Sequence, residues 1–409
     1  MTAGLRGAVL AVGDELLLGD VVNSNAAWLG SALAGVGVTV VHSAMVGDDV
    51  ARLGAALRRA VEDADVVVVT GGLGPTSDDL TRDALAAVAG VPVDRSPALE
   101  QQLRDRFAAY GFPMPDEVLR QADVPRGAQV LDNPVGTAPG LRLAVAGVVV
   151  VALPGPPHEM RAVTEAHLLP ELAARTRTVV TTRTLRCAGT GESAVAQAVE
   201  AVVQLPGGVD LAYLAGDGVV RVRFTTSDDA AVLEPLVQAC AEALGADVFG
   251  LDDDTLPGVV GRLLRDRGQS VATAESLTGG LVGAALSELP GSSRTYRGGL
   301  VVYAGDLKAS LAGVPEQVLS AHGAVSEATA RALAEGARTR LGADWGVATT
   351  GVAGPDTQEG APVGTLHVAV AGPAGTTARA LRLPGDRQRV RLLATTAALD
   401  LLRRTLSRP

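Results

Sequence analysis

The chain has 409 residues, 47% of them apolar and 20% charged, which is enough for about two to four folded domains. Its net charge of −10 argues against a protein that coats nucleic acid or an anionic membrane, because such proteins rely on Lys and Arg. Only 2% of the residues are aromatic, so the cores must consist mainly of Ala, Val and Leu.

The number of cysteines and the length of the apolar runs indicate the cellular compartment. Cys187 and Cys240 are too few for a disulfide scaffold, and they favour a reducing, cytoplasmic location. No cysteine or histidine pair has the spacing of zinc ligands. The longest apolar run, residues 144–153, is too short to span a bilayer, so no membrane segment is expected.

The first part of the chain alternates apolar strands with helical stretches. Strands are expected at 8–12, 38–46, 65–70, 129–131 and 148–153, and helices at 25–34 and 50–61. The nearly unbroken apolar run in 65–70 is typical of a central parallel strand that is buried on both faces. This order predicts a three-layer α/β/α domain over residues 1–174.

Two further domains are expected, so the fold class is α/β with a small α+β module in the middle. Residues 175–252 predict a small α+β module, with strands at 179–187, 211–214, 219–224 and 248–249 and helices at 193–203 and 230–244. Residues 253–409 predict a second α/β domain, with a helix after Ser276, strands at 270–274, 299–303, 345–350 and 364–370, and helices at 256–267, 326–341 and 386–406.

A glycine-rich turn over residues 71–81 follows the central strand of the first domain. Ligands of α/β sheets bind at the carboxyl ends of strands, and glycines let a phosphate approach the backbone. The next helix would present free N–H groups to the same phosphate. The turn therefore predicts a nucleotide site that includes Gly71, Gly72, Gly74 and Thr76.

Two pairs of acidic residues lie at strand ends of this domain. Asp14 and Glu15 end the first strand, and Asp78 and Asp79 lie in the glycine-rich turn. Hard cations take carboxylate oxygens and share phosphates, so these four residues are candidate ligands of Mg²⁺ or a similar divalent ion. The alternative is a tight turn whose acidic residues stabilise a helix N-terminus.

Two more loops in the first domain also follow strands. They are the segments NPVGTAPG (133–140) and PGPPHE (154–159). Because both lie at strand ends of one domain, we expect both to border the nucleotide of the glycine-rich turn. Their candidate nucleotide-binding residues are Asn133, Gly136, Thr137 and Gly155.

Several of these segments together resemble one family. GDELLLGDVVNSNAAWL, GGLGPTSDDLTRDALA, NPVGTAPG and LPGPPHEM look like the N-terminal domain of the CinA (competence/damage-inducible protein A) family. The resemblance implies a molybdopterin-binding-like fold and metal-dependent hydrolysis of ADP-ribose to AMP and ribose 5-phosphate. It also implies a homodimer, with the middle module as a KH-like linker.

The third domain carries the matching C-terminal motifs. TAESLTGG resembles the ESCTGG motif of the CinA C-terminal domain, which is similar to nicotinamide mononucleotide (NMN) deamidases. Tyr303 and Lys308 fit the family's Tyr-x4-Lys segment, and HGAVSEATARALAEGAR, TTGVAGPD and GDRQRVR match further blocks. The family's usual Cys is Leu277 here, and the loop 356–362 lacks a Gly and a Lys common in relatives.

The candidate catalytic residues are Ser276, Tyr303 and Lys308. Ser276 alone would be interpreted as a helix N-cap. Lys308 is the single lysine among 35 basic residues, and the pKa of an ammonium, unlike that of a guanidinium, shifts readily on burial. Together the three residues predict a serine nucleophile whose proton passes to Lys308, directly or through Tyr303. No cofactor is expected for this domain.

Substrate contacts in this domain are expected from backbone and arginine donors. The oxyanion of the reaction needs N–H donors, for which Gly279 with Gly280, or Thr350 with Gly351, are candidates. The resemblance assigns the NMN phosphate to Arg387 or Arg391, with a solvated helix face as the alternative for both.

The favoured interpretation is a bifunctional enzyme of pyridine-nucleotide salvage that acts on NMN and ADP-ribose, without membrane or nucleic-acid contact. One alternative is an N-terminal domain that binds a pterin or nucleotide without turnover. The other is a partner protein in competence or DNA repair.

Overall fold

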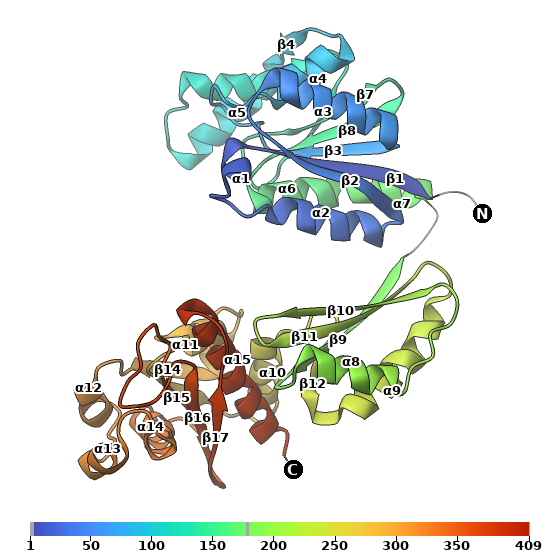
Figure 1. Cartoon of the computed structure of the whole chain (residues 1–409). Coiled ribbons are helices and arrows are strands. Elements are labelled where there is room, and N and C mark those ends of the chain that lie inside the picture. Colours follow the sequence, from blue (N-terminus) through green and yellow to red (C-terminus); the bar gives the residue numbers. More distant parts are fainter. Residues whose placement is uncertain (1–3, 177–179, 409) are drawn as a thin grey trace. The chain divides into compact units, whose positions relative to one another are not determined.

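The computed structural model describes residues 4–176 and 180–408. The chain forms two compact units, Met1–Thr181 and Thr182–Pro409 (Figure 1). Val179, where the first strand of the middle module was expected to begin, lies outside the described residues. Among the helices that the structure describes, none is long and apolar enough to cross a membrane.

The first unit is built on a six-stranded sheet in the order β2-β1-β3-β8-β7-β6. The first four strands in that order run parallel, and the last two are antiparallel to their neighbours. The strand bounds are β1 (Leu5–Val12), β2 (Val38–Val46), β3 (Val66–Thr70), β6 (Gln129–Leu131), β7 (Gly140–Val145) and β8 (Val148–Leu153). A separate two-stranded sheet pairs β4 (Val93–Arg95) with β5 (Asp123–Pro125).

Helices cover both faces of this sheet, so the predicted three layers are confirmed (Figure 1). One core joins α3 (Val50–Asp63) and α4 (Thr81–Ala89) to the sheet, and the other joins α2 (Ser24–Gly35) and α6 (Pro157–Val163). All residues of β3 are buried, because a central parallel strand is covered on both faces. The remaining helices are α1 (Asp14–Leu18), α5 (Pro97–Tyr110) and α7 (Leu169–Thr176).

The second unit begins with the small α+β module. Its sheet has the order β10-β11-β9-β12, and two helices pack on it around Cys187, Phe224 and Cys240. The elements are β9 (Thr181–Ala188), α8 (Glu192–Glu200), β10 (Val209–Gly216), β11 (Val219–Thr226), α9 (Leu233–Leu244) and β12 (Val248–Leu251).

The second unit continues into a five-stranded sheet of order β14-β13-β15-β16-β17, in which the first three strands run parallel. Its strands are β13 (Val271–Glu275), β14 (Tyr296–Val301), β15 (Trp345–Gly351), β16 (Thr365–Gly372) and β17 (Gly375–Arg382). Its helices are α10 (Leu256–Asp266), α11 (Leu281–Ser287), α12 (Gly305–Ser310), α13 (Glu316–His322), α14 (Glu327–Arg340) and α15 (Arg387–Leu406). Separate cores lie against its two faces, one with α10 and α15 and one with α14.

The helix α15 also holds the α+β module within this unit. Arg403 donates to the carbonyls of Ala246 (2.6 Å) and Val248 (3.3 Å) and pairs with the buried Asp400. Arg404 donates to the Ala188 carbonyl at 2.8 Å. The module and the five-stranded domain therefore share a buried polar interface.

Candidate functional sites

The turn after β13 brings Ser276 together with Lys308 of α12. The Lys308 Nζ donates to the Ser276 Oγ at 3.3 Å, to the Val302 carbonyl at 2.9 Å and to the Tyr303 carbonyl at 3.4 Å. The lysine side chain is only 2% exposed, although it is the single lysine of the chain. The sequence prediction that these two side chains meet therefore agrees with the geometry.

Burial changes the acid–base behaviour of this lysine. Removal from water lowers the pKa of the Lys308 ammonium below its ordinary value, because the protein solvates the charge less well. The carboxylates of Glu359 and Asp306 oppose this shift but do not cancel it. A neutral amine next to a serine hydroxyl can accept the hydroxyl proton.

Tyr303 is placed differently from the expectation. Its hydroxyl accepts a hydrogen bond from the Arg387 guanidinium, and its side chain is exposed. Of this residue only the backbone carbonyl contacts Lys308. The geometry therefore favours direct proton transfer from Ser276 to Lys308 over a relay through the phenol.

Glu275, which the sequence analysis missed as a functional residue, organises the turn. Its buried carboxylate accepts from the backbone N–H groups of Gly280 (2.9 Å), Val282 (3.0 Å) and Gly283 (2.8 Å). It also accepts from the Thr278 hydroxyl at 2.8 Å. The signal was available, because an acidic residue stood directly before the candidate nucleophile at the start of a helix.

These contacts correct the expected oxyanion donors. The Gly280 N–H is taken by Glu275, and the Gly279 N–H donates to the Ser276 carbonyl at 3.0 Å. Within the described ranges, the N–H groups of Leu277 and Thr278 have no hydrogen-bond acceptor. Those two groups replace the glycine N–H groups as donors available next to Ser276.

The alternative donor pair lies deep in the sheet. Thr350 is buried in β15, and its hydroxyl donates to the Ala324 carbonyl at 2.6 Å. Gly351 has no room for a side chain, because a Cβ there would lie 2.2 Å from the Thr365 carbonyl oxygen. Both residues thus have clear roles in packing, and no described contact joins either to Ser276.

Arg387 and Arg391, near the start of α15, hold backbone carbonyls. Arg391 donates to the carbonyls of Leu277 (3.1 Å) and Thr278 (2.9 Å), and Arg387 donates to the Gly354 carbonyl at 2.6 Å. Both also line a hollow of about 390 Å³ beside Leu281. Arg391 therefore positions the Ser276 turn, and an anion in the hollow would meet both guanidinium groups.

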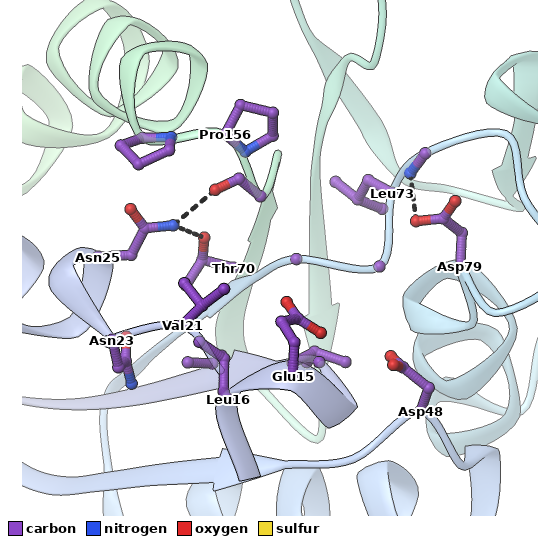
Figure 2. Close-up of a pocket in the computed structure, with 18 of the residues that line it drawn as sticks. Glu15, Leu16, Val21, Asn23, Asn25, Asp48, Thr70, Leu73, Asp79 and Pro156 are labelled. Atoms are coloured by element: carbon purple, nitrogen blue, oxygen red, sulfur yellow. Dashed lines mark hydrogen bonds between the residues drawn. The ribbon is translucent and has the colours of Figure 1, made fainter. Parts of the chain in front are cut away.

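The first unit has a pocket of about 380 Å³ at the carboxyl ends of β1 and β3 (Figure 2). It is lined by Gly71, Gly72, Gly74 and Gly155, as the sequence predicted. The predicted Thr76 does not line it, because its N–H and its hydroxyl both donate to the Asp79 carboxylate within the turn. At Gly71, φ is +102° and a Cβ would lie 2.3 Å from the Val12 carbonyl oxygen, so no other residue fits there.

Asn25 closes one end of this pocket and was not predicted. Its Nδ2 donates to the Thr70 Oγ1 at 3.1 Å and to the Gly155 carbonyl at 2.7 Å (Figure 2). The side chain thereby ties α2 to the ends of β3 and β8. It is a structural link in the wall of the pocket.

Two of the four predicted metal ligands have structural roles instead. The two carboxylate oxygens of Asp79 accept the Gly74 N–H (2.7 Å) and the Thr76 N–H (2.8 Å), so Asp79 shapes the glycine-rich turn. Asp14 does not line the pocket: its Oδ1 accepts the Asp48 N–H at 3.1 Å, and its own N–H donates to the Asp48 Oδ2 at 2.9 Å.

The carboxylates that do line the pocket are those of Glu15, Asp48, Asp78 and Asp79, and Asp48 was missed. Burial, followed by the charges of Asp14, Glu15 and Asp78, raises the pKa of Asp48, and its hydrogen bond from Asp14 opposes this. No group of three or more His, Cys, Asp and Glu within residues 4–176 and 180–408 is arranged to hold a metal ion. The oxygens still fit Mg²⁺, which often takes one or two carboxylates plus substrate phosphates.

The loop 133–140 does not border this pocket, contrary to expectation. Asn133 and Thr137 line a separate pocket of about 440 Å³ against α5. The Asn133 side chain accepts the Gly136 N–H at 3.0 Å and donates to Glu159 at 2.6 Å, so it shapes its own loop. The reason is the sheet order, because β8 and β7 lie between β3 and β6.

The fold and the two sites define a multidomain α/β protein with a molybdopterin-binding-like domain and a buried Ser–Lys pair. Family models match in the same order: "Probable molybdopterin binding domain" over residues 8–174, "Damage-inducible protein CinA KH domain" over 182–250 and "CinA C-terminal domain" over 253–406. The chain belongs to the CinA family.

Relatives extend over the whole chain. It is 50% identical to a CinA-like protein of Frankia casuarinae, covering 98% of this chain and 96% of the relative. It is 44% identical to a CinA-like protein of Gloeobacter violaceus, covering 97% and 96%. A solved CinA structure from Thermoplasma acidophilum is 37% identical, covers 41% of this chain and 98% of its own, and has a TM-score of 0.39.

Proposed function

We propose that the C-terminal domain hydrolyses the carboxamide of NMN to nicotinate mononucleotide and ammonia. The observation that supports this most directly is the buried contact of 3.3 Å between the Lys308 Nζ and the Ser276 Oγ. The Ser276 Oγ attacks the carboxamide carbon while neutral Lys308 takes its proton. The proton then passes to the leaving nitrogen, ammonia departs, and water cleaves the resulting ester to free the serine.

Two other features suit this reaction. The unpaired N–H groups of Leu277 and Thr278 can donate to the developing oxyanion, where one donor is worth about 3–4 kcal/mol. The hollow beside Arg387 and Arg391 can take the phosphate of NMN, because guanidinium groups match phosphate geometry.

Ammonia release from NMN by the full chain tests this function. Wild type should release ammonia, whereas Ser276→Ala and Lys308→Met should not. Ser287→Ala is the matched control, because the hydroxyl of this exposed serine donates to the Ala284 carbonyl of its own helix. Release by Ser276→Ala would refute the nucleophile, and no release by wild type would refute the deamidase.

For the first unit we propose hydrolysis of ADP-ribose to AMP and ribose 5-phosphate in the pocket of about 380 Å³. One or two of the carboxylates of Glu15, Asp48 and Asp78, together with the substrate phosphates, would hold a divalent ion, which when bound neutralises phosphate charge and lowers the pKa of a bound water. The glycine-rich turn would seat the diphosphate, since its backbone is open to close approach.

Formation of AMP should therefore require a divalent ion and fall on Asp48→Asn. Asp63→Asn, at the exposed end of α3, is the control. Binding of nucleotide without turnover would instead support a domain that only binds a nucleotide or pterin.

We further propose a cytoplasmic homodimer with domains at 1–174, 175–252 and 253–409. Sedimentation would test the dimer, and limited proteolysis would test the domain bounds. A salt-insensitive protein complex would favour the competence alternative.

A further inference from the structure

Arg82 is a buried cation directly behind the glycine-rich turn. It lies in the first turn of α4 and is 3% exposed. Its guanidinium donates to the Gly74 carbonyl at 3.1 Å and also to the Leu73 carbonyl. Because Leu73 and Gly74 line the pocket, the positive charge is separated from the pocket by the peptides of the turn alone.

The charge of Arg82 has no ion-pair partner. Within residues 4–176 and 180–408, no carboxylate oxygen lies within 4.0 Å of its guanidinium. Burial accordingly lowers the pKa of Arg82 to about 10, with Asp79 as the leading opposing charge. A buried cation without a partner is unfavourable, and an apolar side chain of similar size is often as stable or more so.

The same turn has donors that are not used. The Gly71 N–H donates to the Leu153 carbonyl at 3.1 Å, and the Gly74 N–H donates to Asp79. The N–H groups of Gly72 and Leu73 have no acceptor among the residues that the structure describes. Both residues line the pocket, so one short segment combines unused donors with a buried positive charge that Asp79 offsets only in part.

We infer that Arg82 is a positioning residue for an anion: it fixes the turn through the Leu73 and Gly74 carbonyls and supplies the charge that a phosphate bound at Gly72 and Leu73 balances. The inference rests on the nucleotide function proposed for this pocket, and it specifies the phosphate group as the part of the ligand that the turn holds. An anion over the turn would satisfy both N–H groups and compensate the buried guanidinium.

Calorimetric titration of the full chain with AMP, in the absence of metal, tests this. Arg82→Met removes the charge at similar volume and should weaken AMP binding by about tenfold or more. Arg82→Lys keeps the charge but cannot hold both carbonyls, so it should bind AMP less tightly than wild type and more tightly than Arg82→Met. Arg142→Met is the control, since Arg142 pairs with Glu171 away from the pocket and should bind AMP as wild type does.

A second readout separates charge from folding. With ADP-ribose as substrate, Arg82→Met should raise KM more than it lowers kcat, and its melting temperature without ligand should stay near that of wild type. If Arg82→Met does not fold, the Arg82→Lys variant provides the test. Loss of AMP binding by a folded Arg82→Lys variant would overturn the role of the charge.

The outcomes distinguish this inference from the function on which it rests. If wild type and Arg82→Met bind AMP equally, the nucleotide pocket stands and the role of Arg82 is refuted. If wild type does not bind AMP or inorganic phosphate, the nucleotide site is refuted and Arg82 with it.

Discussion

Replacing Glu275 by Gln should destabilise the second unit and slow its chemistry together. One carboxylate oxygen accepts the Gly283 N–H, and the other accepts the Gly280 and Val282 N–H groups and the Thr278 hydroxyl. An amide keeps one acceptor oxygen and turns an NH₂ toward a backbone N–H. The change removes a charge-assisted bond, worth about 1.5–3 kcal/mol, and leaves a buried donor unsatisfied at about 1–3 kcal/mol.

The expected loss is therefore about 3–5 kcal/mol, a large part of the stability of an ordinary domain. Trp28 and Trp345 are the only tryptophans and lie in different units, so a Trp28→Phe background makes fluorescence report on the second unit during urea unfolding. Ammonia release should fall at least tenfold, because the turn that carries Ser276 loses its anchor.

Asp344→Asn provides the matched control for Glu275. Asp344 also accepts a backbone N–H, from Ser270 at 2.8 Å, but it is exposed and lies at the other end of β13. This change should leave ammonia release unaltered. The anchoring role of Glu275 would be refuted if the free energy of unfolding of Glu275→Gln were within about 0.5 kcal/mol of that of its parent, since that is the range of neutral surface substitutions.

Three further predictions follow from the two sites. Ammonia release should rise with pH as Lys308 loses its proton. Because burial lowers the pKa of Lys308, the midpoint should lie below the ordinary lysine value of about 10.4. A pH profile of kcat/KM with a midpoint at or above that value would contradict this prediction. Arg391→Lys should lower kcat for NMN about tenfold with less change in KM, because one ammonium cannot hold both the Leu277 and the Thr278 carbonyl as the guanidinium does. A change in KM alone would indicate that Arg391 binds the phosphate instead. Asp79→Asn should weaken AMP binding about tenfold by loosening the Gly74–Thr76 turn, as titration calorimetry would show, and unchanged affinity would refute its structural role.

Several strands of the first unit could be predicted well because the apolar signal of a strand is local. The strands at 38–46, 129–131 and 148–153 match their expected bounds, and the continuous apolar run of β3 reflects burial on both faces. The edge strand β17 was missed, because most of its side chains are partly or fully exposed and need no apolar alternation. The helix α5 was missed for a similar reason, since it buries only Leu99 and Leu103.

The candidate site residues were predictable where each of them carries a local signal of its own. Ser276 and Lys308 were found from their motifs and from the rarity of lysine, and they are in contact. Asn133 was assigned to the wrong pocket, because the order of strands between two loops is a long-range property. Asp48 follows an apolar strand as Asp14 does, so the same reasoning could have included it.

A single helix connects the chemistry of the second unit to its α+β module. At its start, Arg391 of α15 holds the carbonyls of the turn that carries Ser276. About one and a half turns further along, the Thr396 hydroxyl donates to the Asp217 carbonyl of the module at 2.7 Å, and Arg403 near the end of α15 donates to the Ala246 carbonyl. Because an α-helix is stiff over 20 residues, the module and the Ser276 turn are fixed to one rigid element. The module and the Ser276 turn are therefore held by the same helix.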